Sequence, residues 1–139
     1  MPIAKTLIET MDMFTEEIVK ANPNKLFVFG DNMLRYGKGG QAVIRDLPNT
    51  LGIVTKKSPS NDDAAYFSDA DNIEEMNAML QDIRKLYLIS RCNVFTHIVF
   101  PSKGIGTGRA HMKSKSPMLY KMMKNKLETY FNYTFEDSE

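Results

Sequence analysis

The sequence has few of the features that mark specialised classes of protein. Its one cysteine, Cys92, excludes an internal disulfide and a cysteine-rich zinc site, and it fits a reducing compartment. The 18 basic and 17 acidic residues nearly cancel, so no overall charge draws the chain onto nucleic acid or an anionic membrane. No run approaches the roughly 18 apolar residues of a membrane span, and no apolar stretch follows a basic amino-terminal segment. We therefore expect a cytoplasmic protein in which Cys92 is a buried small hydrophobic residue.

The composition is that of an ordinary globular protein, with 42% hydrophobic and 25% charged residues. A chain of 139 residues fits one domain, which at this size buries roughly two thirds of the surface that the unfolded chain exposes. We expect residues 1–139 to form a single domain, and no internal repeat is found in the sequence.

The amino-terminal part of the sequence predicts a buried strand. Residues 3–14 mix β-formers with helix-formers and predict a strand or a short helix. Thr15 is placed to cap a short helix, which ends at Asn22 because a proline follows. Leu26–Phe29 is a continuous apolar run, typical of a strand covered on both faces, so we expect it near the centre of the sheet.

A glycine-rich loop, a helical turn or two and a second strand follow this central strand. The loop spans residues 30–40, the helical segment 41–47 and the second strand Leu51–Thr55. Residues 56–71 are polar and predict a long surface loop, which is uncommon in a compact domain unless it serves a site. The order of strand, glycine loop, helix and strand is typical of an α/β protein.

The carboxyl-terminal half predicts two helices that flank one strand. The first helix starts with Asp71 as its N-cap and runs to about Arg91. The strand spans Val94–Phe100, and Ser116 with the proline after it starts a last helix that continues to about Phe131. The apolar stripe expected on the first of these helices is Ile73, Met76, Leu80, Ile83 and Tyr87.

Seven of the eight glycines fall into two clusters, Gly30 to Gly40 and Gly104 to Gly108, and the eighth is Gly52. Each cluster follows an apolar strand and precedes a helix, which places both at the carboxyl ends of strands, where open α/β sheets bind ligands. Neither cluster has the spacing of a P-loop or of the dinucleotide fingerprint. The alternative is that the glycines only make tight turns between strand and helix.

Two stretches resemble the signatures of the macro domain, a family that binds ADP-ribose. Leu26–Ile44 reads LFVFGDNMLRYGKGGQAVI and His97–Ala110 reads HIVFPSKGIGTGRA. On this resemblance Asn32 takes the place of the asparagine that contacts the distal ribose, and Gly39 and Gly40 take the place of the glycines beside the phosphates. The arrangement is also similar to that of short uncharacterised proteins of phage and bacterial genomes, which implies no activity but would place a viral member in the host cytoplasm.

The resemblance implies an α/β fold of three layers, with a mixed sheet flanked by helices. The pattern of elements by itself predicts a mixed or parallel sheet, with the two glycine loops facing one cleft. The resemblance also implies that the loop Gly104 to Gly108 wraps a diphosphate, and that Asp12 stands where the family has its adenine-contacting aspartate. The residues expected to contact the ligand are Asp12, Gly30, Lys38, Gly39, Gly40, Ser102, Gly104, Ile105, Gly106, Thr107, Gly108 and Arg109.

Asp31 and Asn32 are the candidate catalytic residues. Asp31 could orient a water toward a ribose as general base, or a water held by a phosphate could attack instead, and Asn32 could bind a ribose hydroxyl. The alternative for Asp31 is an Asx-turn or a helix cap. Arg35, Lys38 and Arg109 could neutralise phosphate, or remain solvated. Neither histidine has a partner at ligand spacing, so we expect no metal and no cofactor.

Three functions fit these features. The first is a module that binds ADP-ribose or a related nucleotide diphosphate and also hydrolyses an ADP-ribosyl bond, with ADP-ribosylated protein or nucleic acid as its partner. The second is a non-catalytic binder that sequesters a nucleotide signal, and the third is a protein-interaction module whose glycine loops are only turns. If the second loop binds a diphosphate, we expect Gly106→Glu to abolish binding without unfolding the domain.

Overall fold

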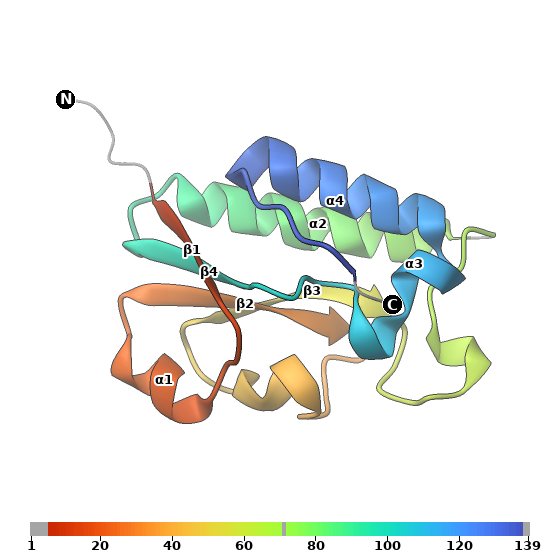
Figure 1. Cartoon of the computed structure of the whole chain (residues 1–139), viewed down its shortest axis with the longest axis horizontal. Helices are drawn as coiled ribbons and strands as arrows, with labels where there is room; N and C mark the ends of the chain where they lie inside the picture. Colours follow the sequence, from red (N-terminus) through yellow and green to blue (C-terminus); the bar gives the residue numbers. More distant parts are fainter. Residues whose placement is uncertain (1–5, 71, 138–139) are drawn as a thin grey trace.

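The computed structural model describes residues 6–70 and 72–137, and its centre is a sheet of four parallel strands. The strands are β1 (Leu7–Met11), β2 (Lys25–Asn32), β3 (Thr50–Lys56) and β4 (His97–Pro101), in the order β1-β4-β2-β3 (Figure 1). The prediction that the second and fourth of these strands lie inside the sheet is therefore confirmed. The expectation of a mixed sheet is wrong, because every pairing among the four strands is parallel. Lys56 at the end of β3 also forms an isolated antiparallel bridge with Tyr66.

Helices cover both faces of the sheet, which gives three layers (Figure 1). The helices α2 (Ile73–Ser90) and α4 (Pro117–Phe131) lie on one face, and α1 (Glu16–Ala21) with the 3-10 helix η1 (Gly40–Ile44) lies on the other. This arrangement follows from the alternation of side chains along a strand.

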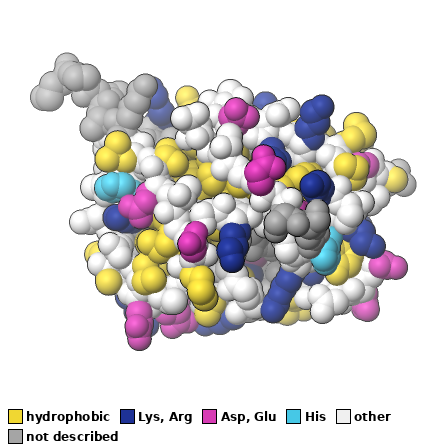
Figure 2. Space-filling model, viewed as in Figure 1, with side chains coloured by type: hydrophobic (Ala, Val, Ile, Leu, Met, Phe, Trp, Pro, Cys, Tyr) yellow, Lys and Arg dark blue, Asp and Glu magenta, His cyan; other side chains and the backbone are white. Residues whose placement is uncertain are grey.

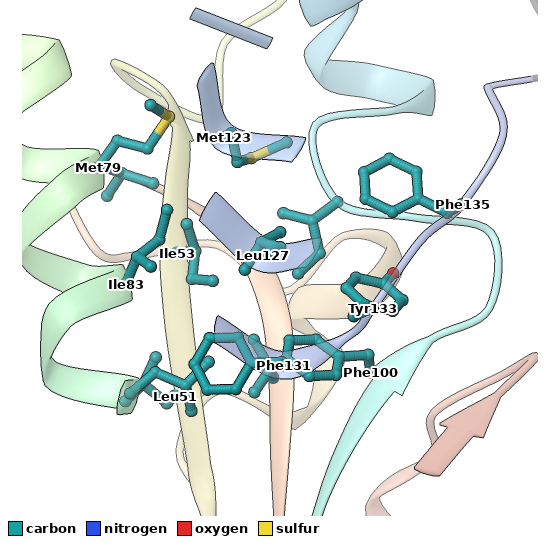
Figure 3. Packing of buried hydrophobic residues seen from close by; sticks show 14 of the residues in the cluster. Leu51, Ile53, Met79, Ile83, Phe100, Met123, Leu127, Phe131, Tyr133 and Phe135 are labelled. Carbon is teal, nitrogen blue, oxygen red and sulfur yellow. The ribbon is translucent and has the colours of Figure 1, made fainter. Parts of the chain in front are cut away.

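The central strand β2 sends alternate side chains into two separate cores. Leu26 and Val28 join the cluster beneath α2 and α4, whereas Phe27 and Phe29 join the cluster beneath α1 and η1. All four side chains are buried, as the continuous apolar run predicts. Figure 3 shows the larger cluster, in which residues from both covering helices meet the sheet: Met79, Ile83, Met123, Leu127, Leu51 and Ile53.

Helix α1 begins and ends as its sequence predicts, and α4 ends where expected but is capped differently. The Oγ1 of Thr15 accepts a hydrogen bond from the N–H of Ile18 at 3.1 Å. Ser116 precedes α4 but is buried and makes no side-chain cap. The carboxylate of Asp69 caps α4 instead, because it accepts from the N–H groups of Met118 (2.9 Å) and Leu119 (3.2 Å).

Four of the five residues of the predicted apolar stripe of α2 pack on the core: Ile83 is buried in it, and Met76, Leu80 and Tyr87 are partly buried against it. The buried residues of α2 are Glu75, Met79, Asp82, Ile83 and Leu86, and Ile73 is 70% exposed. The sequence pattern did not indicate that Asp82 is buried on this side, where its Oδ2 accepts from the N–H of Val54 at 2.9 Å and satisfies a donor at the edge strand β3. The expected N-cap Asp71 lies outside the described residues.

Several loop predictions also need correction. The long loop after β3 contains a short 3-10 helix, η2 (Asp63–Ala65), and buries Phe67, so it is not a surface loop throughout. Cys92 is exposed rather than buried, since it follows the end of α2 at the surface. β4 begins at His97, and Val94 before it is exposed.

The second glycine loop leads into two short helices that the sequence pattern missed, η3 (Gly108–Ala110) and α3 (Met112–Lys115). Residues 3–14 form a strand over Leu7–Met11, with residues 3–5 outside the described part. Among the described residues, no helix is both long enough and apolar enough to cross a membrane.

Candidate functional site

The two glycine loops meet in one pocket at the carboxyl ends of β2, β3 and β4. The pocket has a volume of about 340 Å³, which lies within the range of small-molecule sites. The first loop contributes residues 30–32, 36–37, 39–42 and 45, the end of β3 contributes 55–56 and 58–59, and the second loop contributes 103 and 106–110. The prediction that both loops face one cleft is confirmed.

The charge of this pocket is strongly positive. Among the described residues, four cationic side chains line it, those of Arg45, Lys56, Lys103 and Arg109, against one carboxylate, that of Asp31. Over the face shown in Figure 2, by contrast, basic and acidic side chains are interspersed. The near-neutral total charge thus conceals a local site suited to an anion.

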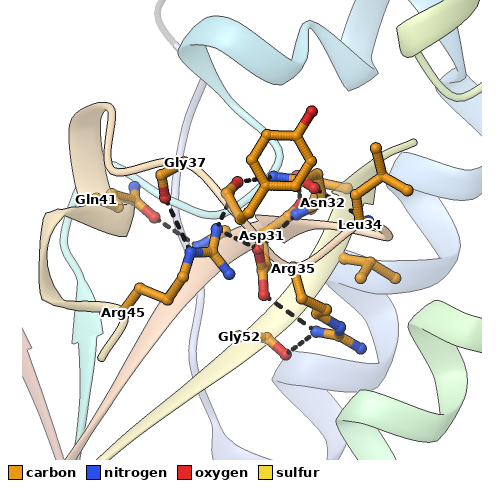
Figure 4. A network of polar contacts seen from close by, with 12 residues as sticks. Asp31, Asn32, Leu34, Arg35, Gly37, Gln41, Arg45 and Gly52 are labelled. Carbon is orange, nitrogen blue, oxygen red and sulfur yellow. Dashed lines mark hydrogen bonds and ion pairs between the residues drawn. The ribbon is translucent and has the colours of Figure 1, made fainter. Parts of the chain in front are cut away.

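The single carboxylate is already neutralised by two arginines. Oδ1 of Asp31 lies 2.6 Å from Nη2 of Arg45, and Oδ2 lies 3.2 Å from Nη1 of Arg35 (Figure 4). Oδ1 also accepts from the N–H of Asn32 at 2.7 Å. Because its side chain is buried and both oxygens are bound, Asp31 has no free oxygen to direct at a water. The geometry favours an anchoring role for Asp31 over the general base that the sequence suggested.

Arg35 joins the first loop to helix α2. Its Nη2 donates to Oδ1 of Asp82 at 2.7 Å, and its Nη1 donates to the carbonyl of Gly52 at 3.2 Å. Partial burial works to lower the pKa of Arg35, but the hydrogen bonds and charges of Asp82 and Asp31 outweigh it, so the pKa is raised. Arg35 holds this position with a φ of 58°, a left-handed conformation that is unusual for a residue other than glycine.

Asn32 organises the loop that follows β2. Its Nδ2 donates to the carbonyl of Tyr36 at 2.8 Å, and its Oδ1 accepts from the N–H of Leu34 at 3.1 Å, the pattern of an Asx-turn. Asn32 lines the pocket, as expected of a ligand contact, but these two hydrogen bonds give its amide a structural task as well.

Gln41 links the two glycine loops and was not singled out from the sequence. Its Oε1 accepts from the N–H of Gly30 at 2.9 Å, and its Nε2 donates to the carbonyl of Gly104 at 2.9 Å. An amide can make this link because it both donates and accepts. The only sequence feature that could have indicated this role is the position of Gln41 directly after Gly39 and Gly40.

The second loop exposes backbone donors to the pocket. Thr107, Gly108 and Arg109 line it, and in the described part of the chain their N–H groups donate to no protein acceptor. Gly108 has a φ of 56°, and a Cβ there would meet nothing within 4 Å, so its backbone faces open space. Backbone N–H groups of this kind form the concave sites that bind phosphate.

Gly106, unlike Gly108, packs closely against core side chains, those of Met112 and Met123. A Cβ on Gly106 would lie 2.5 Å from Sδ of Met112 and 3.0 Å from Cε of Met123, and its φ is 79°. The structure therefore argues against the expectation that Gly106→Glu leaves the domain folded, because the new side chain would press on Met112 and Met123 and would have to adopt a left-handed backbone conformation.

Five residues expected at the ligand do not line this pocket. Oγ of Ser102 donates to Oδ1 of Asp12, and these two residues engage each other. Nζ of Lys38 lies 3.0 Å from Asp46, whose hydrogen bond and charge raise the pKa of this lysine. The other two are Gly104, over which Phe135 packs, and Ile105, which is fully buried.

Two further lining residues, Arg45 and Lys56, were also missed from the sequence. Arg45 Nε donates to the carbonyl of Gly37 at 2.8 Å and so holds the turn of the first loop, and its guanidinium lies over the ring of Phe29. Lys56 is the last residue of β3, a position that the alternation of polar and apolar residues does not distinguish. Within the described residues, no three histidine, cysteine, aspartate or glutamate side chains lie close enough to hold a metal ion.

Comparison with curated proteins and with solved structures finds no match for this chain. The sequence does match the family of unknown function DUF7831 over residues 9–126, a span that includes β2, β3, β4 and both glycine loops. The pocket is therefore built entirely within the matched region. The chain belongs to this family of unknown function, DUF7831.

Proposed function

We propose that this protein binds a nucleotide diphosphate of the ADP-ribose type in the pocket between its two glycine loops. The observation that carries the proposal is the convergence of those loops, from neighbouring parallel strands, on a pocket with four cations and one carboxylate that two arginines already neutralise. A site with this charge balance favours an anionic ligand and disfavours a neutral one.

The phosphates are the groups that the second loop suits best. Its N–H groups at Thr107 and Gly108 supply oriented donors, and the side chains of Lys103 and Arg109 supply charge. Both cations are exposed and form no ion pair with a described carboxylate, so their charges are available to a ligand. Arginine beside backbone donors is a favourable combination for phosphate oxygens.

An aromatic side chain suits the nucleoside part of such a ligand. Tyr36 lines the pocket and is 57% exposed, which leaves ring surface on which a base or a sugar could pack. The choice of ADP-ribose among nucleotides rests on the resemblance of the two loop sequences to macro-domain signatures. It is the part of the proposal that titration must decide.

Binding without hydrolysis is the form of the function that the site favours. A glycohydrolase needs a group that activates water, and Asp31, the one carboxylate among the lining residues, is held by Arg35 and Arg45. A protein-interaction module is the alternative from another class. It would leave the pocket empty of nucleotide in solution.

Isothermal titration with ADP-ribose, NAD, ADP and inorganic pyrophosphate tests the proposal. We expect the wild type to bind ADP-ribose, and Arg109→Gln to bind it at least 10-fold more weakly, since a hydrogen bond to a charged group contributes about 1.5–3 kcal/mol. Lys113→Gln, at an exposed position outside the pocket lining, is the matched control and should bind like the wild type. If the wild type binds none of these nucleotides, the proposal is wrong. If it hydrolyses an ADP-ribosylated substrate, the protein is a hydrolase as well as a binder.

A further inference from the structure

Lys56 is a buried lysine at the wall of the pocket. It is the last residue of β3, it lines the pocket, and only 7% of its surface is exposed. Lysine is almost never buried to this extent without an anionic partner, because removing an ammonium group from water is costly. The surroundings of its Nζ therefore need an account.

The groups around Lys56 satisfy its hydrogen bonds only in part, and none neutralises its charge. Nζ donates to the carbonyl of Ser60 at 2.7 Å and lies 4.9 Å from the centre of the ring of Tyr66. Both groups are neutral. No carboxylate in the described part of the chain lies within 4.0 Å of Nζ, although the adjacent Lys57 pairs with Glu75 at 3.3 Å.

Two basic side chains face Lys56 from neighbouring elements, Arg109 and Lys115. Burial, and then the charge of Arg109 from η3, lower the pKa of Lys56. Lys115 of α3 shares the ring of Tyr66, with its Nζ 5.3 Å from the ring centre. Lys115 is itself paired with Oδ1 of Asp63 at 3.6 Å, whereas no carboxylate in the described part of the chain pairs with Lys56 or Arg109. Positive charge is therefore in excess at this wall.

We propose that Lys56 and Arg109 form a phosphate subsite, in which a phosphate of the bound ligand neutralises the charge of Lys56. This inference rests on the proposed function, because it assigns one part of the same pocket to one group of the ligand. The chemical class is a phosphate carrying at least one full negative charge. A neutral sugar or base at this wall would leave the buried ammonium unbalanced.

A lysine kept for a ligand phosphate should lower the stability of the ligand-free protein, and this effect can be measured. A buried lysine without a counter-ion destabilises the ligand-free fold, so its removal should not lower the melting temperature. A lysine that served the fold through Ser60 and Tyr66 would behave in the opposite way. Substitution of Lys56 therefore lowers affinity without lowering stability only if its charge serves the ligand.

The test compares Lys56→Met and Lys56→Gln with Lys57→Met, the neighbouring lysine that already has its carboxylate. We expect both Lys56 variants to bind ADP-ribose at least 10-fold more weakly while melting at or above the wild-type temperature, and Lys57→Met to bind like the wild type. Unchanged affinity in either folded Lys56 variant, or a lower melting temperature in both, would overturn the inference.

A second measurement separates this inference from the proposed function. Acetylation of the wild type by an amine-acetylating reagent is followed by mass spectrometry without ligand, with inorganic pyrophosphate and with ADP-ribose. We expect pyrophosphate to slow modification of Lys56 several-fold and to leave Lys57 unaffected. Protection of Lys56 in a protein that binds no nucleotide would support the subsite while rejecting the nucleotide proposal. Binding of ADP-ribose with no protection of Lys56 by either ligand would reject the subsite alone.

Discussion

Arg45 Nη2 lies 2.6 Å from Oδ1 of Asp31, and this ion pair joins the end of β2 to the residue that holds the first glycine loop at Gly37. Gly52 on the neighbouring strand makes room for it, because a Cβ there would overlap the carboxylate of Asp31. The buried carboxylate therefore determines where the loop after β2 can run, and Arg45 carries that constraint to the turn at Gly37.

We expect Asp31→Asn to destabilise the domain by about 3 kcal/mol, because removal of one partner leaves the charge of Arg45 buried and unbalanced. Affinity for the ligand should fall together with stability, since the loop loses its anchor. Urea unfolding followed by circular dichroism measures the first effect, and titration below the unfolding transition measures the second.

Asp46→Asn is the control for this change. Asp46 pairs with Lys38 at the surface, and its side chain is 70% exposed, so its substitution should leave the unfolding midpoint unchanged. If Asp31→Asn kept full stability and lost only turnover of an ADP-ribosylated substrate, Asp31 would be a catalytic residue after all.

Gly108 offers a cleaner probe of the second loop than Gly106. Asparagine and aspartate both tolerate the left-handed conformation of Gly108, and a Cβ there meets no atom within 4 Å. Gly108→Asn and Gly108→Asp should therefore share the same small loss of stability. We expect only Gly108→Asp to lower the affinity for ADP-ribose sharply, by at least 10-fold relative to Gly108→Asn, since it adds negative charge where the phosphate is proposed to lie. Equal affinities of the two variants, measured by calorimetry, would place the phosphate elsewhere.

Local sequence signals were sufficient for most of the fold. The apolar run at Leu26–Phe29 indicated an interior strand, Thr15 indicated a helix start, and the end of the last helix at Phe131 was correct. The meeting of the two loops followed from their common position after strands. These features depend on neighbours in the sequence, or on the rule that parallel strands end at the same edge of a sheet.

The charges of the site depend on residues far apart in the sequence and could not be predicted in this way. Asp31 and Asn32 follow a buried strand in the same manner whether or not arginines bind the carboxylate. Asp82 lies 47 positions after Arg35, its partner, and it also accepts a hydrogen bond from the backbone of β3. Lys56 ends an apolar strand and has no local feature that indicates burial without a counter-ion.

Tyr36 should distinguish a nucleotide ligand from a simple polyphosphate. We expect Tyr36→Leu to weaken the binding of ADP-ribose by roughly 5- to 100-fold, the range for removal of one stacked base, and to leave the binding of pyrophosphate unchanged. The hydrogen bonds to the backbone carbonyl of Tyr36 should survive the substitution. Leu34→Ala, at an exposed position of the same loop outside the pocket lining, is the control. Equal weakening for both ligands would show that the substitution disturbs the loop and does not act through base stacking.

The lowered pKa of Lys56 gives the site a pH dependence with a defined sign. In the ligand-free protein, burial and the charge of Arg109 hold this pKa below the ordinary value of 10.5. An anion bound at Nζ favours the protonated form and raises the pKa again. Affinity for ADP-ribose should therefore be greatest where Lys56 is protonated, and it should fall as the pH rises through the lowered pKa. The same titration with Lys56→Gln should fall less steeply over that range, because the contribution of Lys56 is gone and Arg109 does not titrate there.

The stability of the ligand-free protein should change in the opposite direction over the same range. Between the lowered pKa of folded Lys56 and its ordinary value of 10.5, the unfolded chain binds more protons than the folded protein, so this residue makes the free energy of unfolding rise with pH. Other groups titrate as well, and the difference between Lys56→Met and the wild type isolates the contribution of Lys56. Any advantage of the variant should be largest below the lowered pKa and should shrink as the pH approaches 10.5. A difference in urea midpoint that stayed constant with pH would mean that burial does not perturb Lys56, and the case for a missing counter-ion would lose its electrostatic basis.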